Sequence, residues 1–424
     1  MERTRVLVAG AGVIGSSIAC ALAERGVRDV SVVDVDLAGR YASSELNAGG
    51  ARATWWQAVN VAACRDTLAF FGAHAEELSF RRAGYLWLYA DAELWAKARE
   101  ARSLQARLGV EVELLAPAEV SRRFPIVDRS LEELVGATFS PSDGLLNPNA
   151  LRRLYQERAI AGGARFLRRH HLDGIEVAER APGVRAVERV DFTVIAKGDP
   201  ADEARVIERI LTQNGVPREA AVDHVSIRPD VFVNALGAWS PIVSARLGVH
   251  SFSQPVRRQI SIVDVRAHDV PQGVDLHGGP MIVDASGVYF HPEGPYTLAG
   301  YSNADEPAGY RFDYDGDEFF EREIWPRLAH RAASFERAHH VRGWAGLYAV
   351  TPDCSGVLGP IAGFANAIEA HSFTGRGVMQ SRAIGVGVAE LICDGRYRAL
   401  DLSPLSPARF AGPPDGWLRE DLHI

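Results

Sequence analysis

The sequence has 424 residues, of which 47% are apolar, and this composition is typical of a globular protein long enough for two domains. Its formal net charge is −8 and it has no run of basic residues. Nucleic acid is therefore excluded as a partner, because phosphate binding needs a basic surface. The four cysteines are far apart and form no CxxC motif, so neither a metal site nor a disulfide framework is expected. No apolar stretch reaches the ~18 residues of a membrane span, and we expect a cytoplasmic protein.

The N-terminal stretch RVLVAGAGVIGSSIACALAERGVRDVSVVDVD predicts a strand, a glycine-rich turn, a helix and a second strand. Gly10, Gly12 and Gly15 fill the pattern GxGxxG, which permits a tight turn, close approach to a pyrophosphate and close helix packing. Asp34 ends the second strand, where it would bind a ribose and repel a 2′-phosphate, so NADP is disfavoured. The pattern alone does not separate NAD from FAD. The cofactor contacts expected here are Gly10, Gly12, Val13, Ile14, Gly15 and Asp34.

After Asp34 the chain continues as GRYASSELNAGGARATWWQAVN, which is polar and rich in glycine. A nicotinamide enzyme would continue instead with alternating helices and strands, whereas this composition is typical of a loop that lines a ligand. Further on, PDVFVNALGAWSPIVSARLG predicts a buried strand over 231–234 that breaks at Gly237 into a helix. From these segments the expected cofactor contacts are Ser43, Ser44, Asn47, Ala48, Gly49, Gly50, Ala235, Gly237 and Trp239.

A third glycine turn, HSFTGRGVMQSRAIG, covers residues 371–385 and precedes a predicted helix. The absence of side chains at Gly375 and Gly377 indicates that a ligand or another backbone approaches this segment closely, just before the helix begins. The alternative is an ordinary glycine loop before a core helix.

The chain resembles the FAD-dependent amino acid and amine oxidoreductases of the D-amino acid oxidase superfamily, especially sarcosine oxidase, dimethylglycine dehydrogenase and dye-linked proline dehydrogenase. The matching stretches occur in the family's order and are VLVAGAGVIGSSIA, SSELNAGGARA, SDGLLNPNAL, FVNALGAWS, PVRRQ, GVYFHPEG, GLYAVTPD and HSFTGRGVMQSRAIG. The resemblance implies an α/β FAD-binding Rossmann-like domain of the glutathione-reductase type. It also implies an α+β substrate domain with a mainly antiparallel sheet. The resemblance further implies that the loop over 372–379 passes over the flavin, which adds Gly375, Gly377, Val378 and Met379 to the cofactor contacts, together with Leu172. The positive end of the helix dipole that follows this loop would stabilise a reduced flavin, which is negative at N1 and O2, by about 0.3 to 2 kcal/mol.

In this reading the FAD-binding domain is discontinuous and comprises residues 1–80, 145–250 and 335–400. The substrate domain comprises 81–144 and 251–334, and 401–424 is a C-terminal tail. The strand over 289–291 is expected to face the flavin. PADEARVIERILTQNGVPREAAV, at about 200–222, departs from the family pattern and predicts an amphipathic helix. We expect it to pack on the FAD-binding domain; contact with a partner subunit is the alternative.

Oxidation of a carbon that bears an amine needs a placed hydride acceptor and groups that fix the substrate's polar end. Arg52 and Arg376 are candidates for holding a carboxylate, because a guanidinium offers a bidentate fork. A structural or flavin-contacting role for Arg52 and a solvent-facing position for Arg376 are the alternatives. His291 and His371 fall near the expected cavity, and each could instead be a structural histidine. Trp55 or Trp56 could line a substrate pocket or pack against a helix.

Tyr348 is the more informative departure from the family. The glycine oxidase and D-amino acid oxidase branch has an arginine at this place, which binds the substrate carboxylate. Tyr348 cannot do so as an ion pair, which favours an N-alkyl or secondary amine over a primary D-amino acid. It could donate a hydrogen bond to substrate or pack as an aromatic between domains.

We expect noncovalent FAD, because Gly346 occupies the place of the flavin-linking cysteine of sarcosine oxidases and residues 35–60 contain no histidine. The electron acceptor is oxygen, a dye or a protein. Lys97 and Lys197 are the only lysines and lie outside the expected cavity, which favours a dehydrogenase over an oxidase. A D-amino acid dehydrogenase and a noncatalytic flavoprotein subunit or assembly factor are the alternative functions.

Overall fold

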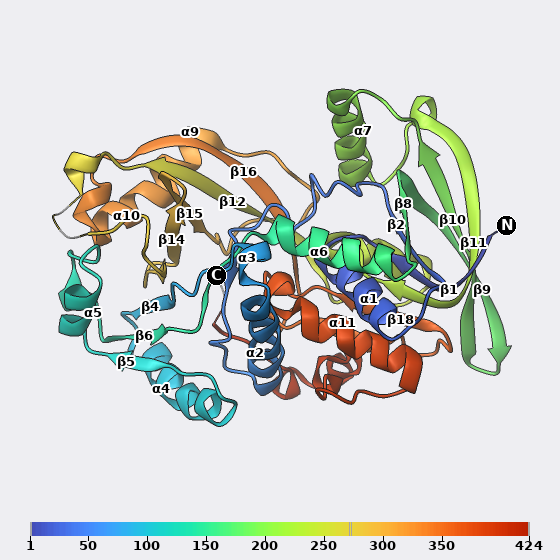
Figure 1. The fold of residues 1–424 in the computed structure, drawn as a ribbon, viewed down its shortest axis with the longest axis horizontal. Helices are drawn as coiled ribbons and strands as arrows, with labels where there is room; N and C mark the ends of the chain where they lie inside the picture. The colour runs from blue at the N-terminus through green and yellow to red at the C-terminus, as the bar shows by residue number, and fades with distance from the viewer. Residues whose placement is uncertain (1, 271, 273, 423–424) are drawn as a thin grey trace.

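The computed structural model describes residues 2–270, 272 and 274–422. Its chain forms two halves, each built on an eight-stranded sheet, which lie side by side in Figure 1. A two-stranded ribbon joins β3 (Gly50–Ala51) to β7 (Gly144–Leu145). Among the described residues, no helix is long and apolar enough to cross a membrane.

The first sheet holds the N-terminus and has the order β17-β18-β11-β1-β2-β8, with β10 paired to β11 and β9 paired to β10. The central strands run parallel, whereas β9, β10 and β17 pair antiparallel with their neighbours. β1 is buried from Val6 to Ala9, as a strand covered on both faces requires. The strands are β1 (Glu2–Ala9), β2 (Val30–Asp34), β8 (Arg165–Arg168), β9 (His170–Ala181), β10 (Val184–Ile195), β11 (Ala221–Asn234), β17 (Val357–Pro360) and β18 (Ala367–His371).

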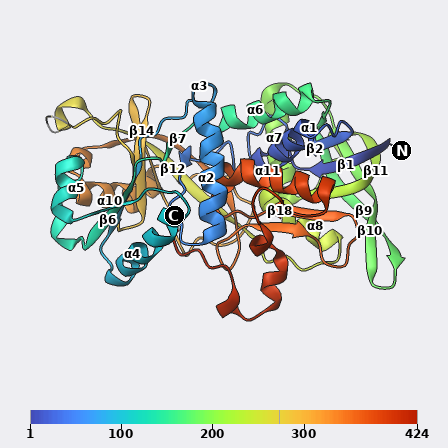
Figure 2. The same cartoon turned by 60° about the horizontal axis from the view of Figure 1, so that its bottom comes forward.

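Helices α1 (Val13–Glu24), α6 (Pro148–Ala161) and α11 (Gly377–Asp394) pack together beside this sheet, and α2 (Ala58–Ala73) lies between them and the second half (Figure 2). α1 is apolar almost all round and buried from Val13 to Leu22, because it lies between the sheet and the other helices. The remaining helices on this side are α3 (Ala75–Leu78), α7 (Pro200–Gln213) and α8 (Ser240–Arg246).

The second sheet has the order β16-β12-β15-β14-β13-β4-β6-β5 and is antiparallel except between β13 and β4. Its strands are β4 (Tyr85–Tyr89), β5 (Glu113–Leu115), β6 (Gly136–Ser140), β12 (Gln254–Asp264), β13 (Met281–Val283), β14 (Val288–Glu293), β15 (Tyr296–Tyr301) and β16 (His339–Val350). One face packs on α5 (Pro117–Arg123), α9 (Gly316–Phe319) and α10 (Trp325–Arg331), with a π-helix at Phe320–Ile324 between the last two. α4 (Ala92–Arg107) lies against β4 and β6.

β16 falls within the range 335–400 that the sequence assigns to the FAD-binding domain, yet it pairs with β12 and completes the second sheet. The chain therefore crosses from one half to the other at the end of β16. The segment from 401 onward is not a loose tail. Glu420 is buried and accepts hydrogen bonds from the backbone N–H groups of Trp56 and Gln57, at the start of α2. Leu422 packs into an aromatic cluster with Tyr85 and other residues of the second sheet.

Candidate functional site

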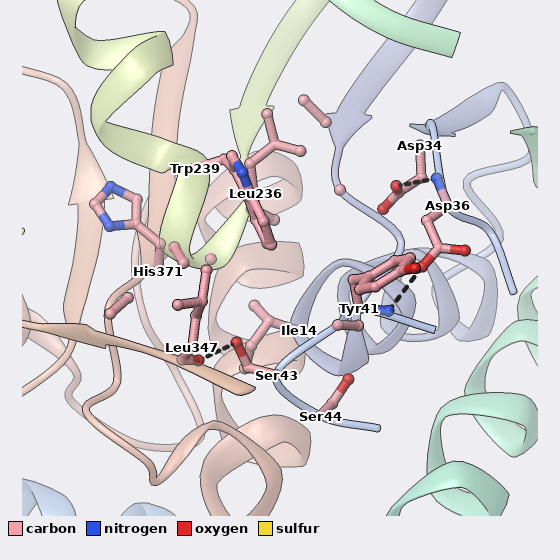
Figure 3. A pocket seen from close by; sticks show the side chains of 18 of the residues that line it. Ile14, Asp34, Asp36, Tyr41, Ser43, Ser44, Leu236, Trp239, Leu347 and His371 are labelled. Atoms are coloured by element: carbon pink, nitrogen blue, oxygen red, sulfur yellow. Dashed lines mark hydrogen bonds between the residues drawn. The ribbon is translucent and has the colours of Figure 1, made fainter. Parts of the chain in front are cut away.

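A cleft of about 1400 Å³, part of it open to solvent, runs along the carboxyl ends of the parallel strands of the first sheet. Ala9, Asp34 and His371 line it at the ends of β1, β2 and β18, and Ala235 lines it just after β11. Ligands of open α/β sheets bind at this edge, where helix N-termini also point. Figure 3 shows Asp34, Asp36 and Tyr41 on one side of the cleft and Trp239 and His371 across from them.

Two helices begin at this cleft. Gly12 is the N-cap of α1 and Gly377 is the first residue of α11, and both line the cleft. A β-carbon on Gly377 would lie 4.0 Å from Cγ1 of Ile14 in the first turn of α1. The cleft therefore receives the positive ends of two helix dipoles, which favours an anionic ligand. Gly237, the remaining predicted glycine turn, lines the same cleft.

The backbone of the GxGxxG segment has the tight turn and close helix packing that the sequence predicts. Gly10 has φ = +106°, a conformation that favours glycine, and it faces the carbonyl of Ala235 too closely for a side chain. Gly15 packs against the carbonyl of Gly10 and does not line the cleft. Its role is the close contact of α1 with β1.

Asp34 lines the cleft, but its carboxylate is engaged by the chain itself. One oxygen accepts from the N–H of Ala11 at 2.7 Å and the other from the N–H of Asp36 at 2.8 Å. Asp36, two residues later, has one buried carboxylate oxygen without a partner among the described residues. Burial raises the pKa of Asp36 to about 6. Asp36 is thus a candidate for binding the ribose that was not predicted from the sequence. It could have been considered because it lies only two residues after Asp34, the acid at the end of β2.

The opposite end of the cleft is formed by β16 and the loop before α11. Leu347 and Tyr348 line it from β16, and Ser43 donates a hydrogen bond to the carbonyl of Leu347 at 2.5 Å (Figure 3). In the loop, Ser372 and Thr374 adopt positive φ angles of 60° and 45°. Such strain in a loop of non-glycine residues is characteristic of ligand-binding segments.

The residues present fit a dinucleotide. Two buried polar atoms, Oδ1 of Asp36 and Oγ of Ser44, line the cleft without partners among the described residues and could bind hydroxyl or phosphate groups. Arg246 adds a cationic side chain to the lining, which the sequence analysis did not identify. The predicted contacts that line the cleft are Gly10, Gly12, Val13, Ile14, Asp34, Ser43, Ser44, Asn47, Leu172, Ala235, Gly237, Trp239, Gly375, Gly377 and Val378.

Apart from Gly15, four predicted cofactor contacts lie outside the cleft lining. Ala48 accepts a hydrogen bond from His291 through its carbonyl oxygen. Gly49 and Gly50 face the carbonyl of Leu146 and the hydroxyl of Tyr85. Met379 is buried in the core around α11. These positions support the walls of the site and do not line it.

Arg52 and His291 are also outside the lining. Arg52 is fully buried; it donates to the carbonyls of Thr54 at 2.9 Å and Leu422 at 2.8 Å and stacks on Trp55, 3.5 Å from the ring centroid. Burial lowers its pKa to about 10. His291 lies 2.8 Å from the carbonyls of both Ala48 and Pro292, and burial lowers its pKa. Both contact patterns match the structural alternatives.

His371 lines the cleft, and its ring nitrogens lie 3.0 Å from Glu369 and 2.7 Å from the hydroxyl of Ser372. Trp55 is buried beneath Arg52, and Trp56 is half-buried with its N–H bound to Glu420. Neither tryptophan lines the cleft. No group of His, Cys, Asp and Glu within the described ranges has the arrangement of a metal site.

Tyr348 lies among arginines at the inner end of the cleft. The guanidinium of Arg258, on the neighbouring strand β12, lies 5.5 Å from the centre of its ring. Gly375 packs against the ring of Tyr348. The next residue, Arg376, has a wholly buried side chain. None of its three guanidinium nitrogens has a hydrogen-bond partner among the described residues. The guanidinium lies 4.7 Å from the ring centroid of Trp55, and Arg376 is outside the cleft lining. Arg258 was quoted within PVRRQ but not predicted as a site residue.

A family model described as FAD dependent oxidoreductase matches residues 5–391. The chain is 30% identical to FAD-dependent oxidoreductase domain-containing protein 1 of Xenopus laevis, over 99% of this chain and 84% of that protein. It is 23% identical to mitochondrial dimethylglycine dehydrogenase of Rattus norvegicus, over 96% of this chain but 45% of that protein. L-proline dehydrogenase from P. horikoshii is similar in structure, with a TM-score of 0.80, 24% identity and coverage of 99% and 100%. Glycine oxidase from Geobacillus kaustophilus has a TM-score of 0.73, 21% identity and coverage of 96% and 98%. These likenesses confirm the predicted fold class.

Proposed function

Because the chain belongs to the FAD dependent oxidoreductase family, whose model matches residues 5–391, we propose that it oxidises the C–N bond of an N-substituted amino acid to an imine, which water then hydrolyses. Bound FAD would supply the acceptor for the hydride from the carbon beside nitrogen. The chain's own residues would bind the substrate carboxylate, orient the amine and exclude water.

The observation that carries the proposal is the buried guanidinium of Arg376, which lies 4.7 Å from the ring centroid of Trp55 but has no hydrogen-bond partner among the described residues. Burial lowers its pKa, which reflects the cost of keeping this cation away from water. A buried charge of this kind needs an anion with hydrogen-bonding oxygens, and a carboxylate matches the guanidinium fork. Arg376 itself is outside the cleft lining, but its neighbours Gly375 and Gly377 both belong to that lining. A substrate carboxylate is therefore the anion we assign to it.

Neighbouring arginines support this assignment by contrast. Arg257 is engaged by Glu306, Asp313 and Asp315, so it has its anions already. The fork of Arg52 is taken by two backbone carbonyls. Arg258 keeps a buried Nε without a partner among the described residues and is the second candidate for the carboxylate.

Tyr348 would orient the substrate by donating a hydrogen bond. Burial raises the pKa of its phenol, so the hydroxyl stays protonated at neutral pH. Burial lowers the pKa of His291, and this ring does not line the cleft. Since a neutral amine can be drawn from solution, the proposed reaction needs no dedicated base.

The relatives and structural neighbours have names that include dimethylglycine, sarcosine, L-proline and glycine. All four are amino acids, and the first three have a substituted nitrogen. Tyr348 stands where the resemblance places the carboxylate-binding arginine of the glycine oxidase and D-amino acid oxidase branch. Together these features favour an N-substituted amino acid over a primary one. The cytoplasmic location and a partner subunit remain predictions.

We further propose that FAD is held noncovalently, with Gly346 facing Leu46 at the position where some relatives carry the linking cysteine. Acid precipitation of the yellow protein should leave the flavin in the supernatant. Yellow colour that remains in the pellet would contradict this part of the proposal.

The substrate is tested by anaerobic mixing of the FAD-loaded protein with sarcosine, N,N-dimethylglycine, L-proline, glycine and D-alanine. Oxidation should bleach the flavin band near about 450 nm, with the N-substituted amino acids faster than glycine and D-alanine. Methylamine and pyrrolidine, which lack the carboxylate, serve as matched compounds and should bleach the band far more slowly. Bleaching by D-alanine alone would instead support a D-amino acid dehydrogenase.

Arg376→Gln should raise the substrate KM by about 10- to 100-fold, because a hydrogen bond to a charged group contributes about 1.5 to 3 kcal/mol to binding. The rate with methylamine, which has no carboxylate, should not change. Arg382→Gln is the matched control, because Arg382 lies on α11, the helix that follows Arg376, and is paired with the partly exposed Glu24. If no amine bleaches the flavin although FAD binds, the noncatalytic flavoprotein alternative is the correct one.

A further inference from the structure

The helix α7, which departs from the family pattern, lies at the edge of the cofactor-binding half beside β10 (Figure 1). Its inner face is apolar: Ile207 and Ile210 are fully buried against Val35 and Ile195. Its outer face is charged, and Arg205 extends into solvent. The helix thus packs on the half of the molecule that contains the cleft.

α7 is tied to the segment that follows β2. The hydroxyl of Tyr41 lies 3.0 Å from a carboxylate oxygen of Glu208 and 3.2 Å from the carbonyl of Ala204, both on α7. The ring of Tyr41 lines the cleft beside Asp36 (Figure 3). In this class of fold the segment that ends β2 binds the ribose of the adenosine half. Contacts to Tyr41 therefore act on that end of the cofactor site.

The C-terminal turn of α7 reaches the cleft itself. Ile210, Leu211 and Asn214 belong to its lining. The carbonyl of Leu211 accepts a hydrogen bond from Nε1 of Trp239 at 2.8 Å, across the cleft from Tyr41. α7 is thereby fixed to both sides of the cleft.

Aromatic rings from the second half complete this closure. Phe312 lies 4.9 Å from the ring of Tyr41 and 6.2 Å from that of Trp239, measured between centroids. Tyr310 stacks on Trp239 at 5.8 Å. The two aromatic residues that hold α7 are thus themselves packed against the other half of the molecule.

We propose that α7 is a wall of the FAD site that retains the cofactor by closing over its adenosine half. The partly buried side chain of Leu211 would contact bound FAD and stabilise it, so loss of α7 should weaken FAD binding and speed its release. The proposal does not depend on which amine is oxidised, because it concerns cofactor binding alone.

A deletion tests it directly. Residue Ile195, at the end of β10, pairs with Ala221 at the start of β11, and the N–H of Ala196 donates to the carbonyl of Ala220 at 2.9 Å. Replacing residues 197–219 by an Asn-Gly turn would therefore leave a direct hairpin between the two strands. FAD fluorescence titration of the apoprotein should show a dissociation constant raised by about tenfold or more, as expected for losing one buried aliphatic side chain. Dilution of the loaded protein should show faster FAD release.

Point variants keep the test decisive if the deletion variant fails to fold. Leu211→Ala removes an apolar side chain from the lining but keeps the carbonyl that binds Trp239. Tyr41→Phe keeps the ring and removes the bond to Glu208. Both should weaken FAD binding and speed its release, whereas Arg205→Ala on the outer face should not. Unchanged FAD affinity and release in both point variants, with circular dichroism that shows a folded protein, would overturn the proposal.

Discussion

Gly375 and Tyr348 fix each other's position at the inner end of the cleft. A β-carbon on Gly375 would come within 2.6 Å of Cε2 of the Tyr348 ring. Gly375 also has φ = +78°, a conformation in which most side chains are strained. Two independent constraints therefore require glycine where the loop before α11 meets β16.

Gly375→Ala should displace Tyr348 and weaken flavin binding as well as stability. We expect the free energy of unfolding to fall by about 2 to 4 kcal/mol, from backbone strain together with overpacking. Gly395→Ala is the matched control. Gly395 follows the last residue of α11 and has φ = +69°, but no atom lies within 4 Å of the added carbon. It should cost about 1 kcal/mol and leave the flavin content unchanged. Equal losses in the two variants would show that the Tyr348 contact has no effect.

Arg52→Lys should destabilise the protein without impairing substrate binding. The guanidinium joins Thr54 to Leu422 and stacks on Trp55, and a lysine cannot make all three contacts. We expect the free energy of unfolding, measured by urea titration, to fall by about 2 to 3 kcal/mol and the substrate KM to stay the same. A raised KM with unchanged stability would instead support the carboxylate role that the sequence suggested.

Asp143 should make stability depend on pH. Burial raises its pKa from 3.8 to about 6, so between these values the folded chain binds more protons than the unfolded chain. Stability should therefore fall as pH rises toward 6, by up to about 1.4 kcal/mol per pH unit from this group. Asp143→Asn should flatten the profile of unfolding free energy against pH, though Asp36 contributes a slope of the same sign. Identical slopes in the two proteins would exclude this role for Asp143.

The reduced enzyme should react with a dye faster than with oxygen. Lys97 is paired with Asp421 at the surface and Lys197 is exposed, and neither lines the cleft. No lysine charge is therefore placed to stabilise developing superoxide. Stopped-flow reoxidation after photoreduction, with oxygen or with an artificial acceptor, compares the two rates directly. A faster reaction with oxygen would identify an oxidase.

The sequence was most informative where local patterns determine structure. The GxGxxG turn, the strand before Gly237 and the glycines before α11 each carry a local signal, and all three border the cleft. The fold class was predicted from the resemblance to the D-amino acid oxidase superfamily, whose motifs occur in the same order along this chain.

Long-range contacts could not be read in the same way. The burial of Arg52 depends on Leu422, which is 370 residues away and carries no motif. Arg376 adjoins two glycines, but the absence of a hydrogen-bond partner for its guanidinium among the described residues becomes visible only when its neighbours are placed. The pairing of β16 with β12 moves a strand between halves for the same reason, because sheet partners are chosen by tertiary packing and not by local propensity.

The order of strands in the first sheet bears on how the protein is made in the cell. β1 pairs with β11, and β11 pairs with β18, so the floor of the cleft joins segments from both ends of the chain. Gly377 must also reach Ile14 before the second helix dipole is in place. During translation the GxGxxG turn is made early, but β11, β18 and α11 cannot pack around it until they have left the ribosome. Flavin capture should accordingly be among the last steps of biogenesis.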